Sequence, residues 1–553
     1  MSRCVLVIAV LAVLSVPARA LVIEAPRAAI KTEGGPGPGG SWNLWSNGRV
    51  GQPLRFGAQG RYAIAVRAWG SSAGGVWPEM ALLLDEEAVE VVTVDRDLAA
   101  DYSFEVVVPA GVHELAVGFL NDAVIGEEDR NLFVRSITVR PLAGAAEPSL
   151  ASAAERTDRI REEERRVLDE AGRAIEKNRK TDAVLRVVSA AGTPISGARV
   201  GVEQVAHEFL FGCNILMFGR FDDEERNEVY KSRFAELFNY ATTGFYWRWY
   251  EPEQGRPRYA ETDEIVAWCA DHGIRMKGHP LLWGHEAGIP PWSKGQPAPD
   301  VQRRRVEAIL DRFSGRIEFW EVVNEPSHLP EPRIDDPYRW ARAADPGAYL
   351  IVNDYLVLGD GAPDFYALLE KAAADGIPFD GIGIQAHEPR AMRFPLARVR
   401  RTLDRYAGLG KELHITEFTP PSAGQEMAGS YAGGKWNEAA QAEYAADFYT
   451  VCFAHPAVRA ITWWDLCDRG AWLEGGGMLR ADLSPKPVYE RLEKLIHEEW
   501  KTRAAGETGA DGTFAFRGFR GTYRIDVEVG GKKVTKEIAL QSAEAVEFVV
   551  SMP

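Results

Sequence analysis

The longest regular pattern in the chain alternates short apolar runs with helical repeats over residues 207–503. Eight apolar runs read as buried strands, and stretches such as 261–273 and 301–313 place apolar residues at helical spacing. This repetition predicts a parallel sheet closed into a (β/α)8 TIM barrel, with function on the loops that follow the strands.

A different pattern precedes the barrel. Residues 21–142 form short alternating runs separated by turn residues, which predicts a β-sandwich module. Residues 143–180 begin with small residues and continue as a highly charged stretch with apolar residues at helical spacing. We interpret this part as a linker and a surface helix that bridges the modules.

Two incomplete β patterns flank the barrel. Residues 181–206 contain two strands around a Gly-Thr-Pro turn, and residues 504–553 contain further strands separated by glycine turns. Together they resemble the small sandwich of carboxypeptidase regulatory domains, interrupted here by the barrel. Two separate hairpins packed on the barrel floor are the alternative. The predicted fold class is therefore multidomain.

Composition restricts the classes of partner. The chain has 553 residues, 46% of them hydrophobic, and a net charge of −16. Without a basic stripe to meet phosphates, we expect no nucleic-acid partner. No segment beyond the N-terminus is long and apolar enough to cross a membrane, and we expect a monomer.

The first 20 residues resemble a secretory leader. Arg3 precedes an apolar run over 4–16, and Ala18 and Ala20 supply small residues at a cleavage site after Ala20. The mature protein is therefore expected to be secreted or periplasmic. It retains four cysteines, Cys213, Cys269, Cys452 and Cys467. They permit up to two disulfides, but their apolar surroundings favour buried free thiols.

Three of the barrel strands end in chemically active side chains. Residues 317–326 end in Asn324, Glu325 and a proline, and residues 411–420 contain Glu417. Between them, Gln385 and His387 end a third strand. Each residue alone could be structural. Together, two carboxylates at one barrel mouth provide what glycosidic-bond hydrolysis requires, one protonated and the other ionised.

These motifs resemble glycoside hydrolase family 10, the endo-β-1,4-xylanase family. The resemblance implies that Glu325 is the general acid/base and Glu417 the nucleophile of a retaining mechanism, with carboxyl groups about 5–5.5 Å apart. It further implies that Asn324 donates to a sugar 2-hydroxyl, that Gln385 polarises the acid/base and that His387 contacts Glu417. Proton transfer and covalent catalysis need no catalytic metal or other cofactor.

Looser matches extend the resemblance around the barrel mouth. The run Gly-His-Pro-Leu-Leu-Trp at 278–283 places His279 and Trp283 beside the glycone sugar. Tyr355 is expected near the entrance, and Trp464 and Trp472 are expected to stack on the sugars that flank the cut. We expect Trp463 to point into the core or between helices.

The second barrel strand departs from the family pattern. The family typically has Thr-x-Glu-Asn-x-Met-Lys-Trp there, whereas this chain has Gly244, Phe245 and Arg248 in place of Glu, Asn and Lys. We therefore expect an apolar, wider glycone site in which Arg248 still binds substrate. The family's Asp beyond the nucleophile is Thr419, so His387 loses an anionic partner.

The N-terminal module carries a cluster of oxygen-bearing side chains, Asn121, Asp122, Asp129 and Asn131. Hard oxygen ligands close in sequence suit calcium, although their spacing is not that of an EF-hand. The surrounding sequence resembles the calcium-dependent xylan-binding modules of carbohydrate-binding families 36 and 60. An acidic surface loop is the alternative.

These patterns favour a secreted, retaining endo-β-1,4-glycosidase that acts on a xylan-like polysaccharide. The alternatives are a related glycosidase with another β-glycan specificity, including the cellulase and mannanase class, and a non-catalytic glycan-binding protein. The sequence leaves endo against exo cutting open.

Overall fold

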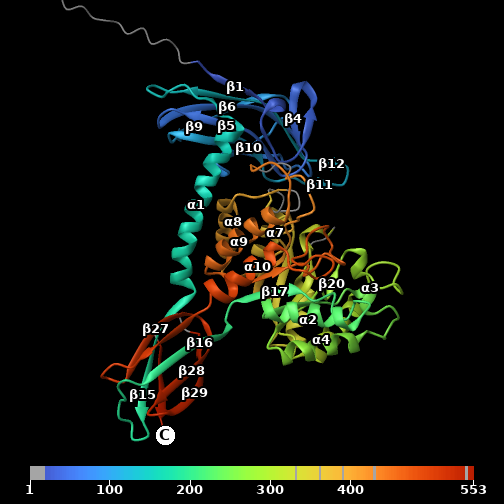
Figure 1. The fold of residues 1–553 in the computed structure, drawn as a ribbon. Helices are drawn as coiled ribbons and strands as arrows, with labels where there is room; N and C mark the ends of the chain where they lie inside the picture. The colour runs from blue at the N-terminus through green and yellow to red at the C-terminus, as the bar shows by residue number, and fades with distance from the viewer. Residues whose placement is uncertain are drawn as a thin grey trace, which may run out of the picture. The chain divides into compact units, whose positions relative to one another are not determined.

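The computed structural model describes residues 19–329, 333–359, 363–388, 392–427, 431–541 and 546–552 (Figure 1). The chain forms two compact units, Met1–Arg159 and Ile160–Pro553. Except for its last two residues, the predicted leader lies outside the described residues. None of the described helices is long and apolar enough to span a membrane.

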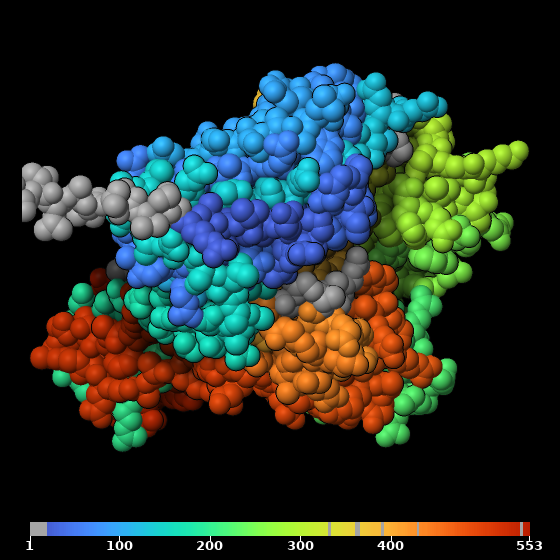
Figure 2. Space-filling model, turned by 90° about the horizontal axis from the view of Figure 1, so that it is seen from above, coloured from blue at the N-terminus to red at the C-terminus, as the bar shows by residue number. Residues whose placement is uncertain are grey.

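The first unit is a sandwich of two six-stranded sheets, shown in blue and cyan in Figure 2. One sheet contains β1 (Leu21–Glu24), β3 (Gly35–Gly37), β4 (Ser41–Leu44), β6 (Gly60–Ser71), β9 (Ala100–Val108) and β13 (Asn131–Pro141). The other contains β2 (Ile30–Lys31), β5 (Gly48–Phe56), β7 (Glu79–Leu84), β8 (Glu87–Thr93), β10 (Gly111–Phe119) and β14 (Ser149–Leu150).

Alternation along the strands explains this sandwich. In β6, Tyr62, Ile64, Val66 and Ala68 are buried in the core between the sheets, whereas the residues between them are not. The predicted β-sandwich is thus confirmed. It extends beyond residue 142, because β14 pairs with β5.

Helix α1 (Ala153–Asn178) follows the sandwich and confirms the predicted charged helix. Its buried stripe includes Val167 and Ile175, which pack into the core of the second unit. Arg179, directly after the helix, is buried and donates to the carbonyl oxygens of Phe453, His455 and Val458 at 2.5–2.7 Å. The end of α1 is therefore held against the barrel.

A second, smaller sandwich forms from the two segments that flank the barrel (Figure 1). Strand β15 (Lys180–Ser189) lies between β27 (Thr513–Phe519) and β30 (Val546–Met552). The facing sheet has the order β26 (Arg503–Glu507), β16 (Arg199–His207), β28 (Gly521–Val529) and β29 (Lys532–Leu540). Each sheet thus joins strands from both sides of the barrel, which confirms one interrupted sandwich and excludes two separate hairpins.

The remaining strands form the predicted barrel, closed by pairing of its third and fourth strands. In order they are β17 (Leu210–Asn214), β18 (Tyr240–Gly244), β19 (Arg275–His279), β21 (Phe319–Asn324), β22 (Tyr349–Asp354), β23 (Gly381–Ile384), β24 (Glu412–Phe418) and β25 (Val458–Trp463). The short strand β20 (Leu282–Trp283) extends the sheet beside β21.

Eight helices among the described residues surround the barrel strands. They are α2 (Glu224–Leu237), α4 (Tyr259–Asp271), α5 (Pro299–Phe313), α6 (Asp335–Ala344), α7 (Pro363–Ala374), α8 (Leu396–Ala407), α9 (Glu438–Ala454) and α10 (Pro487–Lys494). One continuous core fills the space between helices and strands. Cys213, Cys269, Cys452 and Cys467 are buried free thiols, as expected.

Candidate active site

A cavity of about 370 Å³ lies at the carboxyl ends of the barrel strands. It brings together ten of the eleven residues predicted to act on substrate: Glu325, Glu417, Asn324, Gln385, His387, His279, Trp283, Tyr355, Trp464 and Trp472. They come from six different strand ends, so the barrel closure gathers them from across the second unit.

Glu325 occupies a special backbone position. It follows the buried strand β21 and has φ 54° and ψ 49°, left-handed values that are uncommon outside glycine. Pro326 then starts a short helical turn, so the strand cannot continue. This turn directs the carboxylate into the cavity, where Oε1 accepts from Gln385 Nε2 and Oε2 accepts from Trp283 Nε1, each at 2.9 Å.

The surroundings of Glu325 favour its protonated form. Burial raises its pKa, and the negative charge of Glu417 raises it further. The hydrogen bonds from Gln385 and Trp283 oppose this shift, but the net direction is upward. A carboxyl group with a raised pKa keeps its proton to higher pH and can deliver it to a leaving group.

Glu417 is held by different partners. Its Oε1 accepts from Asn353 Nδ2 at 2.8 Å, and its Oε2 lies 3.0 Å from His387 Nε2. Asn353 also donates to Asn324 Oδ1 at 2.9 Å, which orients the Asn324 amide at the same cavity. Asn353 and His387 thus hold the two oxygens of the Glu417 carboxylate in fixed positions. The two glutamates therefore lie in different environments within one cavity.

The ring of His387 has a neutral partner on its other side. Its Nδ1 lies 3.1 Å from the hydroxyl of Thr419, which in turn donates to the Glu417 carbonyl oxygen at 3.1 Å. A hydroxyl can both donate and accept. Thr419 therefore fixes the ring orientation without adding the negative charge that the family's Asp would supply.

A buried ionic group supports the floor of the cavity. Lys277 and Glu321 are completely buried and paired, and the second Glu321 oxygen contacts His279 Nδ1. Although burial alone would raise the pKa of Glu321, the Lys277 ammonium and His279 hold it below its usual range. His279, Glu321 and Glu417 lie close enough to share a metal ion, but the Lys277 ammonium already supplies the cation.

We expect Glu321→Gln to destabilise the protein by about 3–5 kcal/mol, because it leaves the Lys277 ammonium buried without a countercharge. Urea denaturation midpoints measure the change. Glu318→Gln is the matched control: Glu318 directly precedes the same strand but forms a half-exposed ion pair with Arg275, worth about 0–1 kcal/mol. Equal effects of the two substitutions would contradict the prediction.

The second strand end differs from expectation. Phe245 is fully buried and packs against Tyr250, Phe313 and Trp320, so it belongs to the core and does not make the sugar site apolar. Arg248 is exposed on the short helix α3 (Trp247–Tyr250) and does not line the cavity.

Tyr246 supplies the cavity wall at this strand end, with its ring 5.4 Å from the ring of His279 and 6.0 Å from that of Trp283. The expectation of an apolar site was wrong because Phe245, the residue directly after β18, turns into the core, whereas Tyr246 lines the cavity.

Asp465 is a third carboxyl group near the site that sequence reasoning missed. Its oxygens accept from the Trp472 backbone N–H at 3.0 Å and from Asn214 Nδ2 at 3.2 Å. Burial raises its pKa to about 6 despite these hydrogen bonds. Asp465 thus positions the loop that carries Trp472, whose ring is 4.5 Å from the ring of His387. A carboxylate directly after Trp464, at the end of the last strand, was the available signal.

Trp463, directly before Trp464, is fully buried and donates to the Gly476 carbonyl oxygen at 2.8 Å, as expected for a core residue.

The hydrogen bonds to Glu325 allow a prediction of how kcat/KM depends on pH. Trp283→Phe removes a donor that lowers the Glu325 pKa, so the pKa should rise further. Since a general acid must be protonated, the alkaline limb of kcat/KM should move to higher pH. Trp464→Phe makes the same change in the same cavity and should leave the limb in place. A downward shift in Trp283→Phe would contradict the assignment.

The four predicted calcium ligands lie around the end of β10 and the hairpin of β11 (Val124–Ile125) and β12 (Glu128–Asp129). The Asn121 side chain already bonds to the backbone with both polar atoms. Its Oδ1 accepts from the Glu79 N–H, and its Nδ2 donates to the Trp77 carbonyl oxygen. Asn131 Oδ1, by contrast, is buried and has no hydrogen-bond partner among the described residues. This oxygen and the carboxylates of Asp122 and Asp129 are of the hard type that calcium prefers, so the chemistry of these side chains suits calcium.

The sequence profiles of two known families match this chain. The sequence profile of glycosyl hydrolase family 10 matches residues 203–495, more than half of the chain. A second profile, described as a Ca-dependent, xylan-binding carbohydrate-binding module, matches residues 63–151.

Relatives include the anti-sigma-I factor RsgI6 of Acetivibrio thermocellus, 29% identical over 66% of this chain and 47% of that protein. Endo-1,4-beta-xylanase 2 of Arabidopsis thaliana is 27% identical over 68% of this chain and 35% of its own length. Endo-1,4-beta-xylanase B of Thermotoga neapolitana is 28% identical over 57% and 96%. The chain thus spans less than half the length of the first two relatives.

The match of the family profile coincides with the barrel, and both strand-end glutamates lie within it. The chain belongs to glycosyl hydrolase family 10.

Proposed function

We propose that this chain is a secreted, retaining endo-β-1,4-xylanase. The observation that carries the proposal is the contrast between two glutamates in one cavity. Glu325 is held towards its protonated form, whereas Glu417 accepts a hydrogen bond from Asn353 and contacts His387. Xylanases among the relatives and the match to a xylan-binding module support xylan as the substrate.

In the first step Glu417 attacks the anomeric carbon while Glu325 gives its proton to the leaving oxygen. A covalent glycosyl-enzyme forms, and the sugar chain beyond the cut departs. Glu325 then removes a proton from water, which attacks the same carbon and releases Glu417. The Asn324 amide, oriented by Asn353, would donate to the sugar 2-hydroxyl as positive charge develops on the ring.

Product analysis tests the proposal. Purified wild type and Glu325→Ala are compared on glucuronoxylan, arabinoxylan, mannan and β-glucan. Mixed xylo-oligosaccharides released by the wild type and lost in the variant are the expected result, and release of a single short product would indicate exo cutting. Cleavage of mannan or β-glucan alone would mean that the same mechanism acts on another glycan. Xylan binding without any turnover would leave a glycan-binding protein.

Export is the part of the proposal that rests on residues 1–20. The charged start, the apolar run and the small residues before position 21 support a cleaved leader. N-terminal sequencing of protein recovered from the periplasm or medium should begin at Leu21. Retention of Met1 in a cell-associated product would contradict export.

Calcium is expected to stabilise the N-terminal module. At a calcium concentration about 100-fold above Kd, the gain is about 2.7 kcal/mol, which a chelator should remove. We expect Asp129→Ala to abolish the calcium-dependent rise in Tm and calcium-dependent retention on xylan. Glu127→Ala, an exposed change in the same hairpin, should keep both. Identical calcium responses of the two variants would argue for an ordinary acidic loop.

A further inference from the structure

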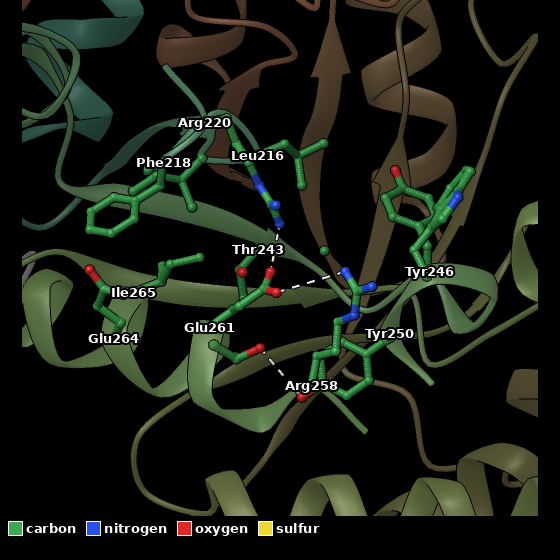
Figure 3. Close-up of a pocket in the computed structure, with 15 residues that line it drawn as sticks. Leu216, Phe218, Arg220, Thr243, Tyr246, Tyr250, Arg258, Glu261, Glu264 and Ile265 are labelled. Atoms are coloured by element: carbon green, nitrogen blue, oxygen red, sulfur yellow. Dashed lines mark hydrogen bonds and ion pairs between the residues drawn. The ribbon is translucent and has the colours of Figure 1, made fainter. Parts of the chain in front are cut away.

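A second cavity, of about 360 Å³, lies beside the active-site cavity and shares Tyr246 with it. The loop after β17, the end of β18 and the helices α3 and α4 enclose it (Figure 3). We call it the branch pocket. None of the predicted catalytic or sugar-binding residues lines it.

The branch pocket opens at the strand end where the chain departs from its family. Gly244 lines it, and a Cβ there would come within 2.8 Å of Leu216 Cδ2 and 3.2 Å of the Tyr246 ring. Because position 244 has no side chain, Leu216 and the Tyr246 ring can lie in the space that a Cβ would occupy. The acidic group that the family places here is absent, and the polar groups of this region come from further out.

Those polar groups are two arginines that share one glutamate. Arg220 Nη2 lies 2.6 Å from Glu261, and Arg258 Nη1 lies 3.7 Å from its other oxygen. Figure 3 shows the two guanidinium groups reaching Glu261 from different sides, while Glu264 points away from them. Glu261 and Glu264, which also lines the pocket, together balance the charge of the two arginines. Each arginine has five N–H donors, however, more than Glu261 alone can occupy.

The pocket also offers an aromatic surface. Trp249 is 57% exposed, and its ring lies 5.9 Å from that of Tyr246. An exposed flat ring next to guanidinium groups suits a ligand that is both a sugar and an anion, because the ring packs on the sugar face and arginine binds carboxylates in a bidentate manner.

We propose that the branch pocket binds a uronic-acid substituent of a decorated xylan chain whose backbone occupies the active-site cavity. The carboxylate of the branch contacts Arg220 and Arg258, and its sugar ring packs against Trp249. This inference rests on the proposed xylanase function and assigns a preference for acidic branches to it.

The test compares three substrates of the same backbone: linear xylo-oligosaccharides, their uronyl-branched forms, and the same branched forms with the carboxylate reduced to an alcohol. The wild type should have kcat/KM about tenfold higher on the uronyl form than on the reduced form, the size of one hydrogen-bonded charge pair. Arg220→Gln and Arg258→Gln should remove this preference and leave hydrolysis of the linear substrate unchanged.

Two further variants sharpen the result. Arg256→Gln removes an exposed arginine that pairs with Glu253 in the same loop, and it should behave as the wild type. Glu261→Gln removes the competing carboxylate, so kcat/KM on the uronyl form should rise.

Two results would overturn the branch pocket. One is loss of activity on all three substrates in Arg220→Gln and Arg258→Gln. The other is equal wild-type rates on the uronyl and reduced forms. A wild type inactive even on linear xylan would instead overturn the proposed function.

Discussion

Replacing Glu417 by alanine should lower kcat on xylan by about four to six orders of magnitude, the loss typical when one member of a catalytic unit is removed. The reason is that no covalent intermediate can form without this carboxylate. Reducing-sugar release from xylan measures the effect, and an unchanged Tm shows that the barrel is intact.

Azide distinguishes loss of the nucleophile from general damage. In Glu417→Ala, azide can occupy the vacated space and attack an activated aryl β-xyloside from the side where Glu417 stood, which yields an α-glycosyl azide. Glu412→Ala is the matched control, since Glu412 begins the same strand but pairs with Arg459 on the surface. A variant at 417 that keeps wild-type turnover, or a β-azide product, would rule out the nucleophile assignment.

Glu325→Ala should lower kcat on xylan by about 10²- to 10⁴-fold, the usual contribution of a general acid. The loss should depend on the leaving group. An activated aryl xyloside needs no proton to depart, so its glycosylation step should be nearly normal, and a burst of released phenol should precede slow hydrolysis. Rapid-mixing kinetics with both substrates measure this difference.

Azide again provides the control, with the opposite stereochemistry. In Glu325→Ala it attacks the glycosyl-enzyme from the side where water normally enters, so a β-glycosyl azide should accumulate. Equal losses on xylan and on the activated substrate would mean that Glu325 does not act through proton transfer.

The barrel, the N-terminal sandwich and the interrupted small sandwich could be predicted from the sequence because each has a regular period. Glu325, Gln385, His387 and Glu417 could be predicted as neighbours for the same reason, since the carboxyl ends of parallel strands meet at one rim. The roles assigned to them remain predictions. Turn chemistry helped at Glu325, where the following proline marks the end of the strand.

Prediction was less successful where a residue's orientation depends on one step of strand register. Phe245 and Tyr246 are adjacent and both aromatic, but one lies in the core and the other lines the cavity. Arg248 matches a family position, but the short helix α3 exposes it. A pattern match carries no information on such a local change of direction.

Residues that act through others were missed. Asn353 contacts both Asn324 and Glu417, although the resemblance at this strand end assigned a place only to Tyr355. Lys277 and Glu321 lie on neighbouring strands 44 positions apart, and their pairing follows from barrel closure rather than from local sequence. Charged residues inside otherwise apolar strands were the signal for them, because a buried charge requires a partner.

The interrupted sandwich has a consequence for biosynthesis. Contacts within it, such as Ala198 with Thr508, join positions 310 residues apart. At about 5–20 residues per second, the ribosome needs roughly 15–60 s to supply the second half. During that time β15 and β16 have unpaired edges, which invite pairing with other chains. A nascent chain stalled before residue 503 should therefore depend on a chaperone, whereas the completed chain covers these edges with its own last strands.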